Sequence, residues 1–240
     1  MSKVVFDVDS IVTGYSKEVD VLHGVSFQIK DDDCVALIGA NGAGKSSIMK
    51  TISGILPCKS GSITFYGERI DTKKTHEIVS KGIIQVPEEG GTFPNLTIKE
   101  NLMISCHSKS TQLHMKDNME LVYNFFPPLK EKSSQMAGVL SGGQRKMLNI
   151  GKAIMAEPEL LLLDDISMGL APKVVEDLYA MLKELTRELK KPVLLVEQIA
   201  DIALDFADYG HVVSQGEIVL SGTSEELLNS DEVQRLYVGG

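Results

Sequence analysis

The segment GANGAGKS at residues 39–46 constrains the fold of this chain more than any other feature. It follows the short apolar run Cys34–Ile38, which predicts a buried strand, and it precedes apolar residues at helical spacing in positions 48–52. The segment matches G-x-x-x-x-G-K-[ST] in the strand–loop–helix context that a phosphate-binding loop requires. We therefore expect an α/β fold with a parallel sheet whose strand ends face a bound phosphate.

Each residue type in this loop has a chemical role in holding a nucleotide. Gly42 and Gly44 allow the backbone to curl so that consecutive N–H groups point at phosphate oxygens. Lys45 is expected to reach the β- and γ-phosphates, and the Ser46 hydroxyl to bind Mg²⁺. The alternative is a glycine-rich turn with an exposed lysine, but the motif positions and both flanking elements favour the phosphate loop. The predicted phosphate-binding residues are Gly39, Asn41, Gly42, Ala43, Gly44, Lys45, Ser46 and Ser47.

A second apolar run, Leu160–Asp164 followed by Asp165, places two acidic residues at the end of a predicted strand. By itself this pattern fits a core strand with a solvated acidic end equally well. Beside a phosphate loop it gains a function, because parallel strands deliver their carboxyl ends to one crevice. We expect Asp164 to hold Mg²⁺ through water and Asp165 to orient the attacking water.

Composition excludes several classes of protein. The 240 residues carry 33 acidic and 24 basic side chains, and the net charge of −9 argues against a nucleic-acid-binding protein. Every apolar stretch is far shorter than the roughly 20 residues that span a bilayer. The three cysteines lack a CxxC spacing and the five histidines lack a metal-ligand spacing. We expect reduced cysteines, structural or exposed histidines, and no metal beyond Mg²⁺.

Hydrophobic patterns divide the chain into a core and a helical insertion. Alternating apolar residues predict antiparallel strands in the first thirty positions, two strands about Gly67 and a hairpin about residues 215–216. An apolar stripe from Val174 to Leu189 predicts a long helix, and Thr223 begins a capping box for a last one. Residues 90–156 are polar with helical spacing, and Pro127 with Pro128 should end a helix there. The prediction is a single domain, 1–240, with a nucleotide-binding core of residues 1–89 and 157–240 and a helical subdomain of residues 90–156.

Between the two nucleotide motifs lies LSGGQ at residues 140–144, followed by an apolar helical pattern. A loop and a helix start are enough to explain its glycines. The order GANGAGKS, LSGGQ, LLLLDD nevertheless resembles the ATPase domain of ABC transporters over nearly the whole chain. The resemblance implies a head-to-tail dimer in which each ATP lies between the phosphate loop of one copy and the LSGGQ of the other. It assigns Ser141, Gly142, Gly143 and Gln144 to this second nucleotide contact, through a hydroxyl and the N–H groups of a helix start.

The same resemblance assigns roles to two further places. Tyr15 stands where the family has an aromatic side chain that stacks on adenine, although a core or surface tyrosine is the simpler explanation. Residues 167–170 (SMGL) resemble the D-loop, which touches the opposite subunit, although they could form only a turn.

Two positions resemble a narrower group within the family. Glu88 aligns with the γ-phosphate- and Mg²⁺-sensing glutamine, whereas Gln85 falls in the preceding predicted strand, and Gln198 aligns with the switch histidine. The phrases VPEEG, LLVEQ and SMGLAPKVVE, with the ending RLYVGG at residues 235–240, resemble ATPase subunits of branched-chain amino-acid importers. Gln198 can donate an amide hydrogen bond to the γ-phosphate but cannot become cationic, so no histidine-like ionisation is expected in the pH profile.

A third position departs even from that narrower group. Asp165 stands where glutamate is usual, and Ile166 where proline is usual. One methylene less draws the carboxylate back by about 1 Å, and misplacement of that size can cost about a hundredfold in rate. We therefore expect the chain to bind ATP and dimerise but to hydrolyse ATP slowly, unless Ile166 or a partner subunit moves Asp165 forward.

The sequence as a whole predicts an α/β P-loop NTPase fold of the ABC ATPase type with an antiparallel β portion. The predicted function is to bind and hydrolyse MgATP as a homodimer, or a heterodimer with a related ATPase, and so drive an importer for branched-chain or other hydrophobic amino acids. The expected partners are transmembrane permease subunits, contacted at residues 93–102, and indirectly a solute-binding protein, which places the chain in the cytoplasm at the inner face of the cell membrane. The rivals are a slow regulatory or structural ATP switch, and an ATPase for urea or amide import or for lipid export.

Overall fold

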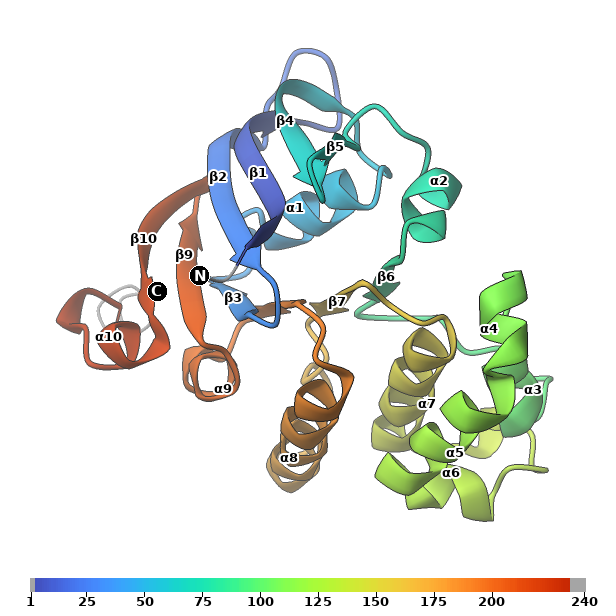
Figure 1. The fold of residues 1–240 in the computed structure, drawn as a ribbon. Coiled ribbons are helices and arrows are strands. Elements are labelled where there is room, and N and C mark those ends of the chain that lie inside the picture. The colour runs from blue at the N-terminus through green and yellow to red at the C-terminus, as the bar shows by residue number, and fades with distance from the viewer. Residues whose placement is uncertain (1–2, 234–240) are drawn as a thin grey trace.

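The computed structural model describes residues 3–233 and folds them into two sheets with a helix between them and further helices on one outer face (Figure 1). The first sheet is antiparallel, with strand order β2-β1-β4-β5. Its strands are β1 (Val4–Thr13), β2 (Leu22–Lys30), β4 (Cys58–Phe65) and β5 (Glu68–Arg69). The antiparallel strands predicted in the first thirty residues and about Gly67 are confirmed, although β4 begins at Cys58 whereas the pattern predicted a start at Gly61.

The second sheet has the order β10-β9-β3-β8-β7-β6 and is parallel except at its β10 edge. In the parallel part, Ile38 pairs with Glu197 and Asp164 pairs with Val196, so the carboxyl ends of β3, β7 and β8 lie level. The phosphate loop and the acidic strand end therefore meet at one edge of this sheet. Its strands are β3 (Cys34–Ile38), β6 (Ile83–Val86), β7 (Leu160–Asp164), β8 (Val193–Glu197), β9 (Tyr209–Ser214) and β10 (Glu217–Thr223).

Alternate side chains of the second sheet belong to two separate cores, because successive residues of a strand point to opposite faces. Val35 and Leu37 pack with α1 (Lys45–Ile52) and the antiparallel sheet, whereas Ala36 and Ile38 pack with helices on the opposite face. Figure 1 accordingly shows α1 between the two sheets. The helices below the second sheet are α8 (Pro172–Leu189) and α9 (Ala200–Phe206), and the described chain continues through β10 to α10 (Ser224–Leu228), which begins after the predicted Thr223 cap.

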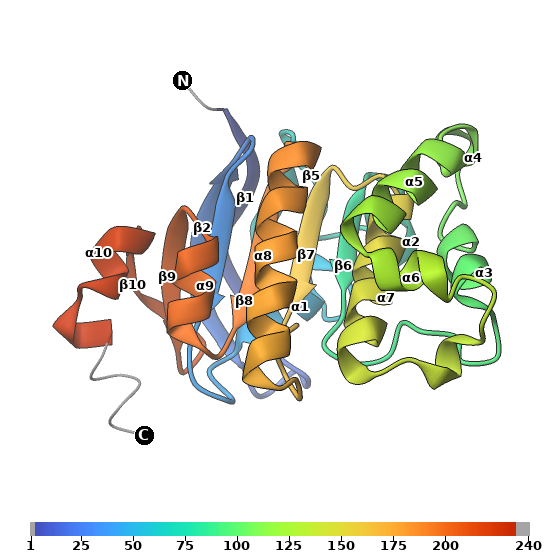
Figure 2. The ribbon, with the colours of Figure 1, turned by 90° about the horizontal axis from the view of Figure 1, so that it is seen from below.

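Helices α3 to α7 gather at one end of the molecule, beside β6 (Figure 2). All of them fall within residues 90–156. Pro127 and Pro128 follow the end of α5 as predicted and also begin α6, since proline fits the first turn of a helix. The sequence did not predict α2 (Thr75–Ser80), whose only buried residue is Ile78. The helices are α3 (Ile98–Met103), α4 (Lys109–Leu113), α5 (Met115–Phe125), α6 (Pro127–Glu131) and α7 (Gly142–Met155), with a 3₁₀ turn η1 (Ala137–Val139) before α7.

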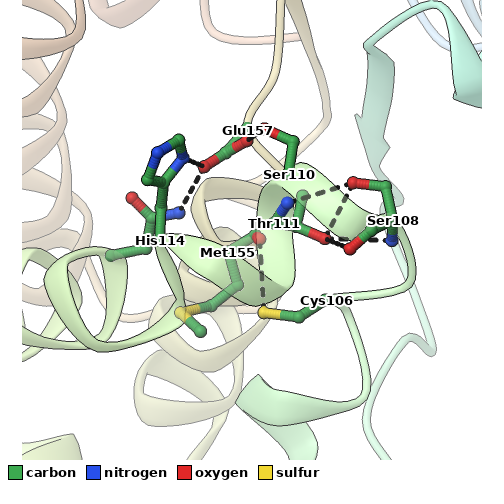
Figure 3. Close-up of polar contacts among 8 residues, drawn as sticks. Cys106, Ser108, Ser110, Thr111, His114, Met155 and Glu157 are labelled. Atoms are coloured by element: carbon green, nitrogen blue, oxygen red, sulfur yellow. Dashed lines mark hydrogen bonds and ion pairs between the residues drawn. The ribbon is translucent and has the colours of Figure 1, made fainter.

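One carboxylate ties α4 and α5 to the end of α7 (Figure 3). Glu157 accepts hydrogen bonds from Ser110 Oγ at 2.8 Å and Asn118 Nδ2 at 3.1 Å, and His114 Nδ1 lies 2.7 Å from its Oε1. Burial by itself raises the pKa of Glu157, but these hydrogen bonds outweigh burial and lower the pKa below its usual value. Glu157 is therefore a charged anchor at the border between the helical subdomain and the core.

Two further expectations concern membrane-spanning helices and the C-terminal residues. Within residues 3–233, no helix is both long enough and apolar enough to cross a membrane. The ending RLYVGG, which contributed to the resemblance, lies outside the described residues.

Candidate functional site

The carboxyl ends of β3, β7 and β8 surround a cavity of about 600 Å³. Most of the predicted nucleotide contacts line it, from the phosphate loop, the acidic strand end and the segment after β6. Gly39 and Ala43 instead line a smaller hollow of about 170 Å³ beside β9. Asp164 lies below the surface, 7% exposed. The predicted residues that line the large cavity are Tyr15, Asn41, Gly42, Gly44, Lys45, Ser46, Ser47, Glu88, Asp165 and Gln198.

The phosphate loop needs glycine at positions where backbone conformation or close packing excludes a side chain. Gly42 and Gly44 have φ angles of 79° and 112°, in the left-handed region. A Cβ on Gly39 would lie 2.3 Å from the carbonyl oxygen of Val213, so Gly39 allows β9 to approach the loop. The turn between β9 and β10 also supports the loop, since Gly216 N–H donates to the Ala43 carbonyl at 2.8 Å. That support was not predicted.

Lys45 folds back onto its own loop. Its Nζ donates to the carbonyl oxygens of Gly39 at 2.6 Å and Ala40 at 3.0 Å. Burial lowers the pKa of Lys45, while the carboxylates of Asp165, Glu197 and Asp164 act in the opposite direction. The ammonium therefore lies beside the cavity, bonded to two carbonyl oxygens, where it can exchange these bonds for stronger ones to a phosphate.

Tyr15 lies at the mouth of the cavity and is 61% exposed. Its hydroxyl lies 3.4 Å from Ser47 Oγ and accepts from Lys50 Nζ at 3.3 Å. The Lys50 ammonium also lies 5.4 Å from the ring centroid. Hydrogen bonding to Ser47, the largest effect, lowers the pKa of Tyr15 despite partial burial. The exposed ring is thus held by α1, where an adenine could stack on it.

The surroundings of Asp164 are suited to binding a cation. Its Oδ2 accepts from Gln85 Nε2 at 3.1 Å, and its Oδ1 is buried without a hydrogen-bond partner among residues 3–233. Burial, the first cause, and the charges of Glu88 and Asp165 raise the pKa of Asp164 to about 6. An unpaired buried oxygen among carboxylates is the arrangement that a Mg²⁺ ion or its bound water would stabilise.

Asp165 and Gln198 face each other across the ends of β7 and β8. Gln198 Nε2 donates to Asp165 Oδ2, and both residues line the cavity. The backbone of Asp165 is left-handed, with φ of 44°, and its N–H donates to the Val196 carbonyl at 2.9 Å. The carboxylate position is therefore set by the turn that follows β7, which a backbone hydrogen bond ties to β8.

Three functional contacts were missed from the sequence. Gln85 lies in β6 as predicted, but it also holds Asp164 and accepts from Ser53 Oγ at 2.5 Å. Lys146 of α7 is 9% exposed and donates to the carbonyl of Glu88. Glu197 is completely buried at the end of β8. The only signal in the sequence was a polar residue inside an apolar pattern, which does not reveal its partner.

The LSGGQ segment forms the start of α7 and lies outside the cavity of its own chain. Ser141 caps the helix by accepting from Gln144 N–H at 3.3 Å, and Gln144 Oε1 accepts from Ser141 N–H at 3.3 Å. A Cβ on Gly143 would lie 2.6 Å from Val174 Cγ1, so this glycine also allows α8 to pack closely.

An apolar groove of about 310 Å³ lies between α2, β6 and α7. Residues 93–102 were expected to line a partner groove, but none of them lines this one. Ile98 and Leu102 are buried in the core with α7, and Phe93 is 48% exposed with Lys152 Nζ 4.6 Å from its ring centroid. The expectation for residues 93–102 stays a prediction, and Pro94 of that segment lines a neighbouring hollow of about 510 Å³ beside Glu88 and Ala137. The groove contains Ile55, Ile78, Val79, Ile84, Ala153 and Ala156.

A phosphate loop, an acidic strand end and a nearby exposed aromatic ring at one sheet edge define a P-loop nucleotide-binding protein. Residues 22–167 match the family model described as ABC transporter. That match covers more than half of the chain, so the chain belongs to the ABC transporter family. The predicted ABC ATPase fold is confirmed, and the chain is an ATP-binding subunit that hydrolyses ATP.

Similar proteins match this chain over nearly its whole length. It is 40% identical over 232 residues to the high-affinity branched-chain amino acid transport ATP-binding protein BraG of Pseudomonas aeruginosa, covering 97% of this chain and 98% of BraG. It is 33% identical to the probable branched-chain amino acid transport ATP-binding protein LivF of Archaeoglobus fulgidus, covering 94% of this chain and 95% of LivF. The ADP conformation of MJ1267, an ATP-binding cassette of an ABC transporter, has a TM-score of 0.84 and 28% identity, with 100% of both chains covered.

Proposed function

We propose that this chain is the ATPase of an importer for branched-chain or other hydrophobic amino acids. The cavity at the ends of β3, β7 and β8 carries the proposal for ATP, because it combines the phosphate loop with Asp165 and Gln198. The similarity to BraG and LivF over nearly the full length of each chain supports the class of solute. The ATPase itself does not contact the solute.

The proposed roles within the cavity follow from the side chains that line it. The N–H groups of residues 41–46 and the Lys45 ammonium bind the phosphates, and Tyr15 stacks on adenine. Gln198 donates its amide to the γ-phosphate, and Asp165 orients the attacking water. The residues Ser46, Asp164 and Glu88 would hold Mg²⁺, Asp164 through water. When bound, Mg²⁺ would neutralise the charge that develops on the phosphate oxygens.

We propose that two ATPase chains, identical or related, sandwich each nucleotide. The start of α7 supports this arrangement: it is solvent-facing at Ser141, and the first N–H groups of a helix have no partner within it. Because these groups lie outside the cavity of their own chain, a second copy is needed to bring Ser141, Gly142, Gly143 and Gln144 to ATP. The segment of residues 167–170, with Met168 49% exposed, would meet the second chain beside them.

The membrane partner would dock in the apolar groove between α2 and α7. Ser105 and His107 border this groove, and the Glu157 anchor holds the neighbouring helix α4. The groove also touches Gln85, which holds Asp164. A permease segment seated there would contact the helical subdomain and the nucleotide site together. We propose that the chain works at the cytoplasmic face of the membrane when it is docked in this way.

A slow ATP switch is the second candidate, and Asp165 is the observation that favours it. Its backbone N–H donates to the Val196 carbonyl. A forward shift of the turn, which would make up for the shorter reach of the aspartate carboxylate, would break that hydrogen bond. In this alternative, ATP closes the dimer and hydrolysis is too slow to support transport.

Two measurements test the proposal. Calorimetry with MgATP should give binding by the native chain, loss of binding in Lys45→Ala, and retention in Lys173→Ala, a matched control on the exposed surface of α8. Equal binding by the native chain and Lys45→Ala contradicts the ATP site.

For the solute, the chain should restore leucine uptake when it replaces the related ATPase in membranes that contain the matching permease subunits. Restored ATP hydrolysis without leucine uptake contradicts the proposed solute class.

A further inference from the structure

Glu197 is a completely buried carboxylate at the end of β8, directly before Gln198. Its Oε1 accepts from the Ser167 N–H at 2.9 Å and from the Tyr179 hydroxyl. Its Oε2 accepts from the Ser167 hydroxyl at 2.7 Å and from the Gln198 N–H at 3.3 Å. A buried carboxylate is costly unless it is hydrogen-bonded, and here four donors converge on it.

The four donors match the chemistry of an ionised carboxylate. Its two oxygens offer about four acceptor positions and no donor, whereas a glutamine side chain would offer one acceptor oxygen and a donor group. Burial, the largest effect, raises the pKa of Glu197, and the hydrogen bonds from Tyr179 and Ser167 lower it. An apolar or amide side chain at this position would leave at least one of these donors unpaired.

Glu197 connects three segments that lie next to the nucleotide site. Ser167 begins the segment of residues 167–170 after the acidic strand end, Tyr179 belongs to α8, and Gln198 lines the cavity. Two further bonds tie the same strand ends, from Asp165 N–H to the Val196 carbonyl at 2.9 Å and from Gln198 Nε2 to Asp165 Oδ2. Glu197 does not line the cavity, so it acts on hydrolysis through these neighbours and through the effect of its charge on Lys45.

We propose that Glu197 is a positioning residue for ATP hydrolysis, which locks residues 167–170 and Gln198 into one rigid unit. The inference rests on the proposed roles of Asp165 and Gln198. The lock keeps the Gln198 amide aimed at the γ-phosphate, and it fixes Met168 at the cavity edge at the same time. The segment that faces the second chain and the residue that contacts ATP therefore move together.

Glu197→Gln tests the lock with a side chain of nearly the same shape. The expected result is a fall in kcat of at least tenfold, with the Kd and KM for MgATP within twofold of the native values. Thermal stability should fall only modestly, since the variant leaves a buried donor unpaired but keeps the shape of the side chain. Glu176→Gln, which removes an exposed charge from α8, is the matched control and should behave as the native chain. An unchanged kcat in Glu197→Gln overturns the inference, and so does a parallel loss of stability, affinity and kcat, which indicates a purely structural role.

A separate test asks whether the effect of Glu197 on hydrolysis is transmitted through Ser167. Ser167→Ala removes one donor, so it should lower kcat less than Glu197→Gln does, and the double variant should be no slower than Glu197→Gln. Strictly additive losses overturn the path through Ser167.

A measurement without nucleotide separates this inference from the proposed function. Amide hydrogen exchange of Ser167 or of Gln198 should accelerate at least tenfold in Glu197→Gln, because the two N–H groups bond different oxygens and glutamine keeps only one acceptor oxygen. Equal exchange rates overturn the lock even if ATP binds. Failure of the native chain to bind ATP would overturn the proposed function and leave the exchange result to decide the lock.

Discussion

Replacing Asp165 by glutamate is expected to accelerate ATP hydrolysis. Asp165 follows β7 in a left-handed turn with φ of 44°, and its N–H is bonded to the Val196 carbonyl. The backbone therefore cannot move toward the nucleotide without breaking that bond. The cavity of about 600 Å³ in front of Asp165 has room for one additional methylene. A longer side chain is consequently the simplest way to bring the carboxylate forward.

The size of the effect follows from geometry. One methylene advances the carboxylate by about 1 Å, and a displacement of that order changes the rate by about a hundredfold when catalysis depends on positioning. A hundredfold change corresponds to about 2.7 kcal/mol of activation free energy. Glutamate is less suited than aspartate to a left-handed backbone, so a slightly lower thermal stability should accompany the faster rate.

The assay is phosphate release at saturating MgATP for the native chain, Asp165→Glu and Asp165→Asn. The glutamate variant should be faster by up to about a hundredfold with an unchanged Kd for ATP. The asparagine variant keeps the shape but loses the carboxylate, so it should be slower than the native chain. Equal rates for the native chain and Asp165→Glu would refute the argument that reach limits hydrolysis.

Three further predictions concern neighbouring residues. Gln85→Leu removes the donor that holds Asp164, so the Mg²⁺ concentration for half-maximal hydrolysis should rise severalfold; an unchanged Mg²⁺ titration would contradict this role. Tyr15→Ala should weaken ATP binding by about 1–3 kcal/mol in calorimetry while Tyr15→Phe preserves it, and equal losses in both would exclude stacking. Burial lowers the pKa of His211 to about 4, so neutral His211 stabilises the fold above pH 6.5 and this contribution is lost as the pH falls toward 4. Denaturant unfolding should show a loss of up to about 3 kcal/mol over that range, and His211→Asn should flatten the curve; parallel curves would contradict the assignment.

Much of the fold was predictable because its signals are local. The strand β3, the phosphate loop and α1 follow one another within twenty residues, and the glycines and apolar spacing specify each of them. The hairpin β9–β10 and the Thr223 cap of α10 are equally local. The apolar stripe from Val174 to Leu189 correctly predicted helix α8. The buried side of that helix differs slightly from the prediction, because Val175 and Tyr179 are buried while Val174 is only half-buried. Spacing along a helix gives its apolar side only approximately, and packing selects the final orientation.

The amino-acid sequence by itself determined the phosphate loop, the acidic strand end and the order of the elements that carry them. Only the tertiary structure decided that Gln85 holds Asp164, that Lys146 reaches Glu88 and that Glu197 joins Ser167 to Gln198. The partners in the first two contacts lie 79 and 58 residues apart. Such contacts depend on which strands are neighbours and on their register, here β7 beside β8 with Asp164 opposite Val196. Strand order is a property of the whole packed chain, because it minimises the free energy of two cores at once, and no local pattern of residues specifies it.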